Sequence, residues 1–258
     1  LARLDDRRQI LRQVDHVRWA ADAGLLDGLD RLREQAFRVI LGSVADAFDV
    51  KKEDAATLAR YDTSTLVRPE TISTRWNNHK HYRDHSQSLG KLLLLARRLC
   101  EAGCGFVTVT TSFVWDMHAD VNNAGVDEGM GYMGMPLDYA LSALIEDLAA
   151  RGLDERILVV VCGEMGRTPR LNARGGRDHW GNLAPLLLYG GGLPKGQVIG
   201  QSTRDGGEPL TEPVRIKNLL GTILHTLLDT GEVRTARGVP TEINRLLAEA
   251  EPITGLVS

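Results

Sequence analysis

Apolar residues recur at helical spacing from the first residues of the chain. They stand at positions 1, 4, 10, 11 and 14, and a second run follows with Leu25, Leu29, Leu32, Ala36, Val39 and Ile40. Steps of three and four residues place such side chains on one face of a helix. The pattern therefore predicts helices through the first forty positions.

The same periodicity returns twice before residue 105. It covers residues 51–61, and then residues 89–103, where Gly103 follows a last turn that carries Arg97 and Arg98. Glycine commonly ends a helix, and cationic side chains favour its C-terminal dipole. Polar residues dominate between these helices, from Asp62 to His85. We predict a helical region over 1–105 with an irregular, solvated surface excursion at 62–85, which includes His79, His81 and His85.

Strands and helices alternate after Gly105. The run FVTVTT at 106–111 is rich in β-branched residues, and ILVVVC at 157–162 is apolar throughout. Because helical spacing over 136–152 separates these runs, they form a predicted βαβ unit, which is parallel by default. Further strands are expected at 184–192 and 196–200, and a helix at 213–229. The pattern indicates an α/β protein with a mostly parallel sheet after the helical N-terminal region, the two parts being residues 1–105 and 106–258.

Composition narrows the functional class. The 258 residues include 31 Lys and Arg against 34 Asp and Glu, which gives a net charge of −3, and 43% are hydrophobic. This is too apolar for a disordered chain and too balanced for nucleic-acid binding driven by phosphate neutralisation. The apolar runs are much shorter than the roughly 18 residues of a membrane span. Three cysteines without a paired spacing indicate neither a disulfide framework nor a cysteine zinc site.

Acidic and histidine side chains concentrate next to the predicted strands. Asp116 and His118 follow the first strand, Glu164 and Arg167 follow the second, and Asp178 with His179 immediately precedes the third. Ligand sites in open α/β sheets lie beyond the carboxyl ends of the strands, and these side chains are common ligands of zinc and related ions. Each residue alone could simply cap a turn, hold a loop or form an ion pair. Together they predict a divalent-metal site in which His118 and His179 are the leading ligands.

A series of short motifs resembles a known family. In order they are LLLARRLCEAG, FVTVT, WDMHAD, LVVVCGEMGRTPRLN, GGRDHWGN and LLLYGGGLPKGQVIG. This order resembles the domain-of-unknown-function family 1501, which is grouped with the alkaline phosphatase and sulfatase superfamily. The resemblance implies an alkaline-phosphatase-like three-layer sandwich in which this chain is the C-terminal portion of a longer, exported protein. It also implies a periplasmic or extracellular location.

The resemblance also implies roles for particular residues. Asp116, His118 and His179 would contribute to one metal site and Glu164 to a second, with zinc as the leading ion and manganese or iron as alternatives. The nucleophile and a further metal-binding Asp would lie upstream of Leu1. The chain departs from the superfamily pattern at Glu164, which is followed by Met165 where Asp followed by His is usual. Met117 is a second departure, because relatives often have Thr there.

The expected function is that of a fragment of a metal-dependent hydrolase of phosphate or sulfate esters. Its substrate would be a small anionic ester or a sulfated or phosphorylated carbohydrate, with Arg167 as an anion donor and Asp178 orienting His179. A structural ion pair between Arg167 and Glu164 is the alternative for that arginine. The alternative function is a non-catalytic binding or scaffold protein that retains the fold. A carbohydrate-binding role, with Trp115 and Trp180 as stacking faces, is the third interpretation.

Overall fold

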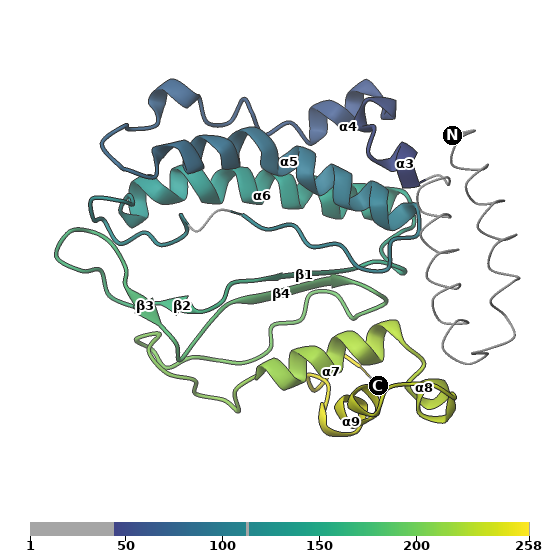
Figure 1. Cartoon of the computed structure of the whole chain (residues 1–258). Helices are drawn as coiled ribbons and strands as arrows, with labels where there is room; N and C mark the ends of the chain where they lie inside the picture. The colour runs from purple at the N-terminus through teal and green to yellow at the C-terminus, as the bar shows by residue number, and fades with distance from the viewer. Residues whose placement is uncertain (1–43, 112–113, 258) are drawn as a thin grey trace, which may run out of the picture. The chain divides into compact units, whose positions relative to one another are not determined.

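The computed structural model describes residues 44–111 and 114–257, and these are mostly helical (Figure 1). The predicted helices of the first forty positions lie outside the described residues. The chain divides into two compact units, one of residues 1–58 and 95–108 and the other of residues 59–94 and 109–258. The helices are α3 (Val44–Ala47), α4 (Ala55–Arg60), α5 (His79–Glu101), α6 (Val126–Ala150), α7 (Ile216–Leu227), α8 (Thr230–Thr235) and α9 (Thr241–Glu249), with 3-10 turns at Val50–Lys52 and Pro69–Thr71.

The strands form one long, interrupted hairpin. β1 (Leu158–Cys162) pairs antiparallel with β4 (Leu186–Gly190), and β2 (Gly166–Arg167) pairs antiparallel with β3 (His179–Trp180). The chain leaves β1, continues through β2, turns in the loop 168–178 and returns through β3 to β4. Each described sheet therefore has two strands, and both are antiparallel.

This arrangement shows that the predicted three-layer sandwich with a mostly parallel sheet is wrong. That prediction paired residues 106–111 with 157–162 across a helix, but the structure assigns no strand to 106–111. β-branched residues favour extended backbone, yet a strand also needs a neighbouring backbone to bond. The partner of β1 is instead β4, and because no helical crossover joins these two segments they pair antiparallel. Residues 196–200 likewise form no strand.

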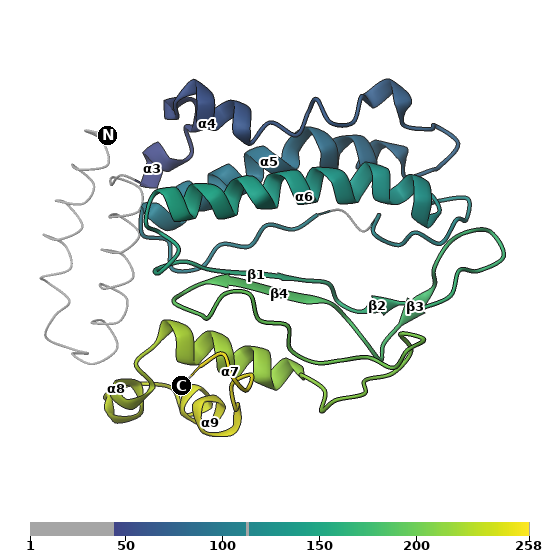
Figure 2. The same ribbon diagram turned by 180° about the vertical axis from the view of Figure 1, so that it is seen from behind.

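Helices cover both faces of the β1–β4 pair within the second unit. Figures 1 and 2 show α6 on one side of the strands and α7 on the other, in both views. The Tyr189 hydroxyl of β4 donates a hydrogen bond to the Ile145 carbonyl of α6, at 3.4 Å. α7 corresponds to the predicted helix at 213–229, and its Thr222 hydroxyl accepts a hydrogen bond from the backbone of Ile253 at 2.9 Å. Among residues 44–111 and 114–257, none of the helices combines the length and the apolar composition that a membrane span requires.

Two long helices begin earlier than the apolar pattern predicts. α6 begins at Val126 rather than 136, so Pro136 lies inside the helix and is buried. The helix still ends near its predicted limit, where Gly152 adopts a φ of 64°, a left-handed conformation that glycine adopts without steric cost. α5 begins at His79, inside the predicted excursion. His85 is consequently buried rather than solvated, and its Nε2 lies 3.1 Å from the Met133 carbonyl oxygen.

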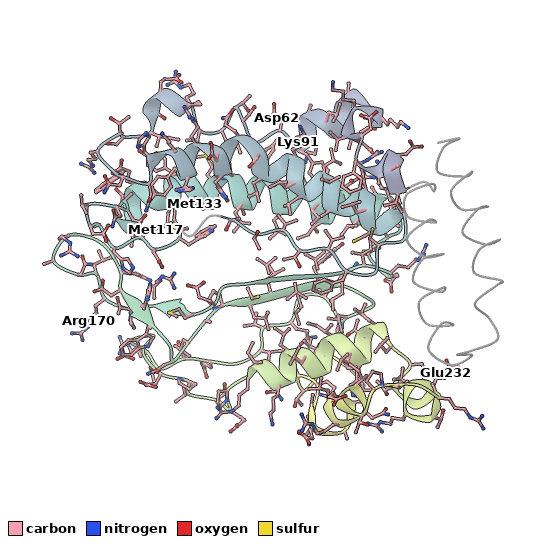
Figure 3. The ribbon with its side chains drawn as sticks, viewed as in Figure 1. Asp62, Lys91, Met117, Met133, Arg170 and Glu232 are labelled. Carbon is pink, nitrogen blue, oxygen red and sulfur yellow. The ribbon has the colours of Figure 1, made fainter. Side chains whose placement is uncertain are left out.

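A buried cluster supports the segment that carries Asp116 and His118. Its members come from α5, α6 and the loops before them: Val67, Ile72, Tyr82, Val114, Met117, Ala124, Tyr132 and Met133. Figure 3 labels Met117 and Met133, which both belong to this cluster. The Tyr82 hydroxyl also accepts a hydrogen bond from the Ala124 backbone at 2.9 Å. Because Met117 is anchored in the core, the side chains before and after it are held at the surface of this unit.

Candidate metal centre

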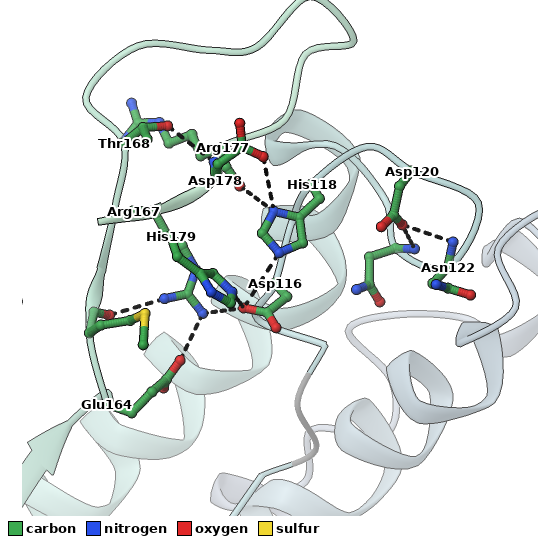
Figure 4. Close-up of polar contacts among 12 residues, drawn as sticks. Asp116, His118, Asp120, Asn122, Glu164, Arg167, Thr168, Arg177, Asp178 and His179 are labelled. Atoms are coloured by element: carbon green, nitrogen blue, oxygen red, sulfur yellow. Dashed lines mark hydrogen bonds and ion pairs between the residues drawn. The ribbon is translucent and has the colours of Figure 1, made fainter. Parts of the chain in front are cut away.

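The site forms where the distal end of the hairpin meets the segment 116–119 (Figure 4). The Arg177 backbone N–H donates to the Met117 carbonyl at 2.9 Å, and the Val126 N–H donates to the Gly175 carbonyl at 3.1 Å. In the β2–β3 ladder, Arg167 stands directly opposite His179. Residues opposite each other in an antiparallel pair project on the same face. Backbone pairing thus brings Arg167 and His179 to the same place as Asp116 and His118.

Three of the four predicted metal ligands come together there. Asp116, His118 and His179 each offer one ligand atom, and these atoms lie within 4.8 Å of one another. Oδ1 of Asp116 lies 3.0 Å from Nε2 of His179 and 3.9 Å from Nε2 of His118. Ligands of a tetrahedral ion at about 2.0 to 2.2 Å stand about 3.3 to 3.6 Å apart. One distance is shorter than that spacing and the other is longer, and the three atoms lie within 4.8 Å of one another, so the side chains would have to move for all three to hold one ion.

The His118 ring is fixed in a ligating orientation. Its Nδ1 donates a hydrogen bond to the Arg177 carbonyl at 2.8 Å and lies 3.3 Å from Oδ1 of Asp178. A proton held on Nδ1 leaves the lone pair of Nε2 directed toward Asp116 and His179, whose ring centroid is 4.9 Å from that of His118. Metal-binding histidines are typically held in this way through their second ring nitrogen.

The backbone around His118 is also constrained. The Asn172 side-chain amide donates to the His118 carbonyl at 3.0 Å, and the Arg174 Nε donates to the Ala119 carbonyl at 2.9 Å. Ala119 has a φ of 54°, which is strained for a residue with a side chain. At Gly176 an added Cβ would lie 2.2 Å from the His118 carbonyl carbon, so only glycine allows this approach. Sequence reasoning missed Asn172 and Gly176, although the glycine pair before Arg177 was a signal of close backbone contact.

Asp178 contacts a different histidine from the one that the sequence predicted. Its carboxylate lies beside His118 and accepts a weak hydrogen bond from the Asn172 amide at 3.4 Å. Asp178 and His179 are neighbours in an extended segment, and successive side chains there point to opposite faces. Asp178 therefore orients the ring of His118, which belongs to segment 116–119, and not the ring of its neighbour His179.

Glu164, the fourth predicted ligand, lies outside the group of three and binds Arg167. The Arg167 guanidinium donates to Oε1 of Glu164 at 3.0 Å and makes a short contact with Oδ1 of Asp116. The pKa of the Glu164 carboxyl is lowered, first by a hydrogen bond from its own backbone N–H and then by Arg167. Glu164 is therefore an ionised carboxylate at the edge of the site.

The two tryptophans near the site both have a hydrogen-bond partner for the indole nitrogen. Nε1 of Trp180 donates to the Gly207 carbonyl at 2.7 Å, and Nε1 of Trp115 donates to the Thr111 hydroxyl at 2.9 Å. The Asn182 amide also donates to Glu208, at 2.6 Å. Trp180 and Asn182 thus attach the turn at 203–208 to the strand that carries His179.

These features define a mostly helical protein in which an antiparallel hairpin and the segment 116–119 together form a candidate histidine and aspartate metal centre. The family described as "Protein of unknown function (DUF1501)" matches residues 2–256, and the chain therefore belongs to this family. No similar protein was found among curated proteins or among solved structures. The predicted relationship to alkaline phosphatases and sulfatases stays a prediction.

Proposed function

We propose that this chain binds a divalent transition-metal ion through Asp116, His118 and His179, and that the ion serves the hydrolysis of phosphate or sulfate esters. The observation that carries the proposal is the approach of the three ligand atoms to within 4.8 Å of one another. They come from two separate chain segments, and His118 is held in a ligating orientation by Arg177 and Asp178. Chance clusters of exposed acidic side chains lack such support.

The donor set favours particular ions. Two imidazoles and one carboxylate suit zinc, with manganese and iron as alternatives, and suit calcium poorly because calcium prefers oxygen ligands. His179 donates to Asp116 at 3.0 Å through Nε2, the atom that would bind the ion. Metal binding would therefore release that proton, and the affinity would rise with pH.

The chemistry expected of the site follows from this donor set. A bound ion would supply Lewis-acid polarisation of an ester oxygen. Asp116, His118 and His179 would hold the ion, and Asp178 would keep the His118 proton on Nδ1. His179 has a side chain that is 51% exposed, so a substrate could reach this side of the site from solvent.

The decisive experiment measures metal content and turnover together. Protein purified without chelators should contain about one zinc ion per chain. His118→Ala and His179→Ala should lose most of that metal, while His225→Ala, which changes a histidine of α7 outside the group, should keep it. Equal metal in all four proteins would reject the site, and so would metal-free wild type.

Activity separates the hydrolase from its alternative. Wild-type protein and His118→Ala should be assayed on an aryl phosphate and an aryl sulfate, in this chain and in any longer form of the protein. Turnover that disappears with His118→Ala supports hydrolysis. Bound zinc without turnover on either ester would instead favour the binding or scaffold role.

A further inference from the structure

The Arg167 guanidinium has no N–H group left for a substrate. An arginine side chain has five such groups, two on each terminal nitrogen and one on Nε. One terminal nitrogen donates to the Met165 and Gly166 carbonyls at 3.1 and 3.0 Å. The other donates to Asp116 and to Glu164. Nε is buried and has no hydrogen-bond partner among the described residues, so an anion in solvent does not reach it.

The two bonds to the hairpin backbone fix the position of this guanidinium. The Arg167 side chain is 17% exposed, whereas that of Glu164 is 65% exposed. The exposed Glu164 carboxylate is therefore the more mobile partner, and the anchored arginine determines where it lies. Arg167 contacts both Glu164 and the ligand Asp116, so Glu164 lies near the metal ligands. Without its ion pair to Arg167, Glu164 would be free to turn toward them.

We propose that Arg167 is a positioning residue, which orients Asp116 toward the two histidines and holds Glu164 out of the coordination sphere of the ion. This inference rests on the proposed metal function. The ion would then have three protein ligands, as in catalytic zinc sites that keep one position for water or substrate. The Glu164 carboxylate, as a fourth protein ligand, would fill that position and tighten metal binding at the expense of turnover.

The test is a double-mutant cycle read out by zinc affinity. Wild type, Glu164→Gln, Arg167→Met and Arg167→Met/Glu164→Gln are titrated with zinc against a chromogenic chelator. In the wild-type background Glu164→Gln should change the zinc Kd less than about twofold, because Glu164 is not a ligand. In the Arg167→Met background the same change should weaken binding by roughly 10-fold or more, a size usual for residues around a metal site. That difference is the coupling between the two residues.

Cobalt substitution gives a signature that mere instability would not produce. The visible spectrum of bound Co²⁺ depends on coordination number and ligand type. Arg167→Met should change this spectrum, and adding Glu164→Gln should return it toward that of wild type. Arg167→Lys, which retains a cation for Glu164, should lie closer to wild type than Arg167→Met. Arg170→Met, at an exposed arginine three residues along the chain, is the matched control and should leave both affinity and spectrum unchanged.

The outcomes distinguish this inference from the function on which it rests. Failure of wild type to bind zinc or cobalt would reject the proposed function and the inference with it. Metal binding in wild type, with Glu164→Gln weakening it equally in both backgrounds, would reject only the inference. If Arg167→Met does not fold, the single variant Glu164→Gln still decides, since a loss of about 10-fold in zinc affinity would identify Glu164 as a ligand.

Discussion

Two arginines in this protein each bridge a pair of carboxylates, and they differ in what surrounds them. Arg97 contacts Glu53 at 2.8 Å and Glu101 at 2.7 Å, and its side chain is 0% exposed. Arg167 contacts Asp116 and Glu164 in the candidate metal centre, beside His118 and His179. An arginine between two acids is therefore no sign of function by itself. The convergence of imidazoles on one of those acids distinguishes the second cluster.

Replacing each of these two arginines with methionine should lower the free energy of unfolding by very different amounts. Arg97→Met removes the buried guanidinium that contacts Glu53 and Glu101, and although Arg98 still contacts Glu53, the free energy of unfolding should fall by about 2 to 3 kcal/mol. Arg167→Met acts on more exposed carboxylates and should cost about 1 kcal/mol. Urea unfolding of both variants measures the difference. Equal losses would show that the site cluster is a structural ion pair like the other.

Close backbone packing is the second property of the candidate metal centre that can be tested. Gly176→Ala would place a methyl group against the His118 carbonyl, so the loop must shift, at a cost of about 1 to 3 kcal/mol. Zinc affinity should fall by roughly 10- to 100-fold because the His118 ring loses its support. Gly181→Ala is the control, since an added Cβ there meets nothing within 4 Å. Unchanged zinc affinity in Gly176→Ala would contradict the proposed orientation of His118.

The prediction with the smallest expected effect concerns His85, a buried histidine outside the candidate metal centre. His85 is buried, its ring stands edge-on to Trp115 at 6.0 Å, and burial lowers its pKa from the usual value of 6.5. Since the folded-state pKa is the lower one, the unfolded chain takes up the proton first. The stability that neutral His85 contributes is therefore complete above pH 6.5 and is lost as the pH falls below it.

His85→Gln should reduce this acid sensitivity. The measurement is urea unfolding at pH 7.5 and pH 5.5 for wild type and variant, and the wild type should lose more stability between the two. The same loss in both proteins would assign the acid sensitivity to other groups. The test is independent of metal, because His85 lies outside the group of potential ligands.

The sequence determined the local features of this protein. Helical spacing predicted α7 and the ends of α5 and α6, since the spacing of apolar residues and a following glycine act within a few residues. The residue types also indicated which side chains could hold a metal: Asp116, His118 and His179 are all present in the group that the structure brings together. The beginnings of α5 and α6 were missed because polar residues and Pro136 obscure the periodicity there.

Only the tertiary structure decided how distant segments pair. Residues 106–111 and 157–162 have strand-forming sequences, but strand pairing depends on which backbone arrives beside each one, and here β4 returned to β1 as an antiparallel hairpin. The same path placed Asp178 against His118 and Arg167 against Asp116, whereas the ion pair of Arg167 with Glu164, three residues away, was open to prediction from the sequence. The contact of Arg167 with Asp116 spans 51 residues, and that of the His118 ring with the Arg177 carbonyl spans 59. Such contacts have no signature in local spacing, because they depend on the whole course of the chain between the partners.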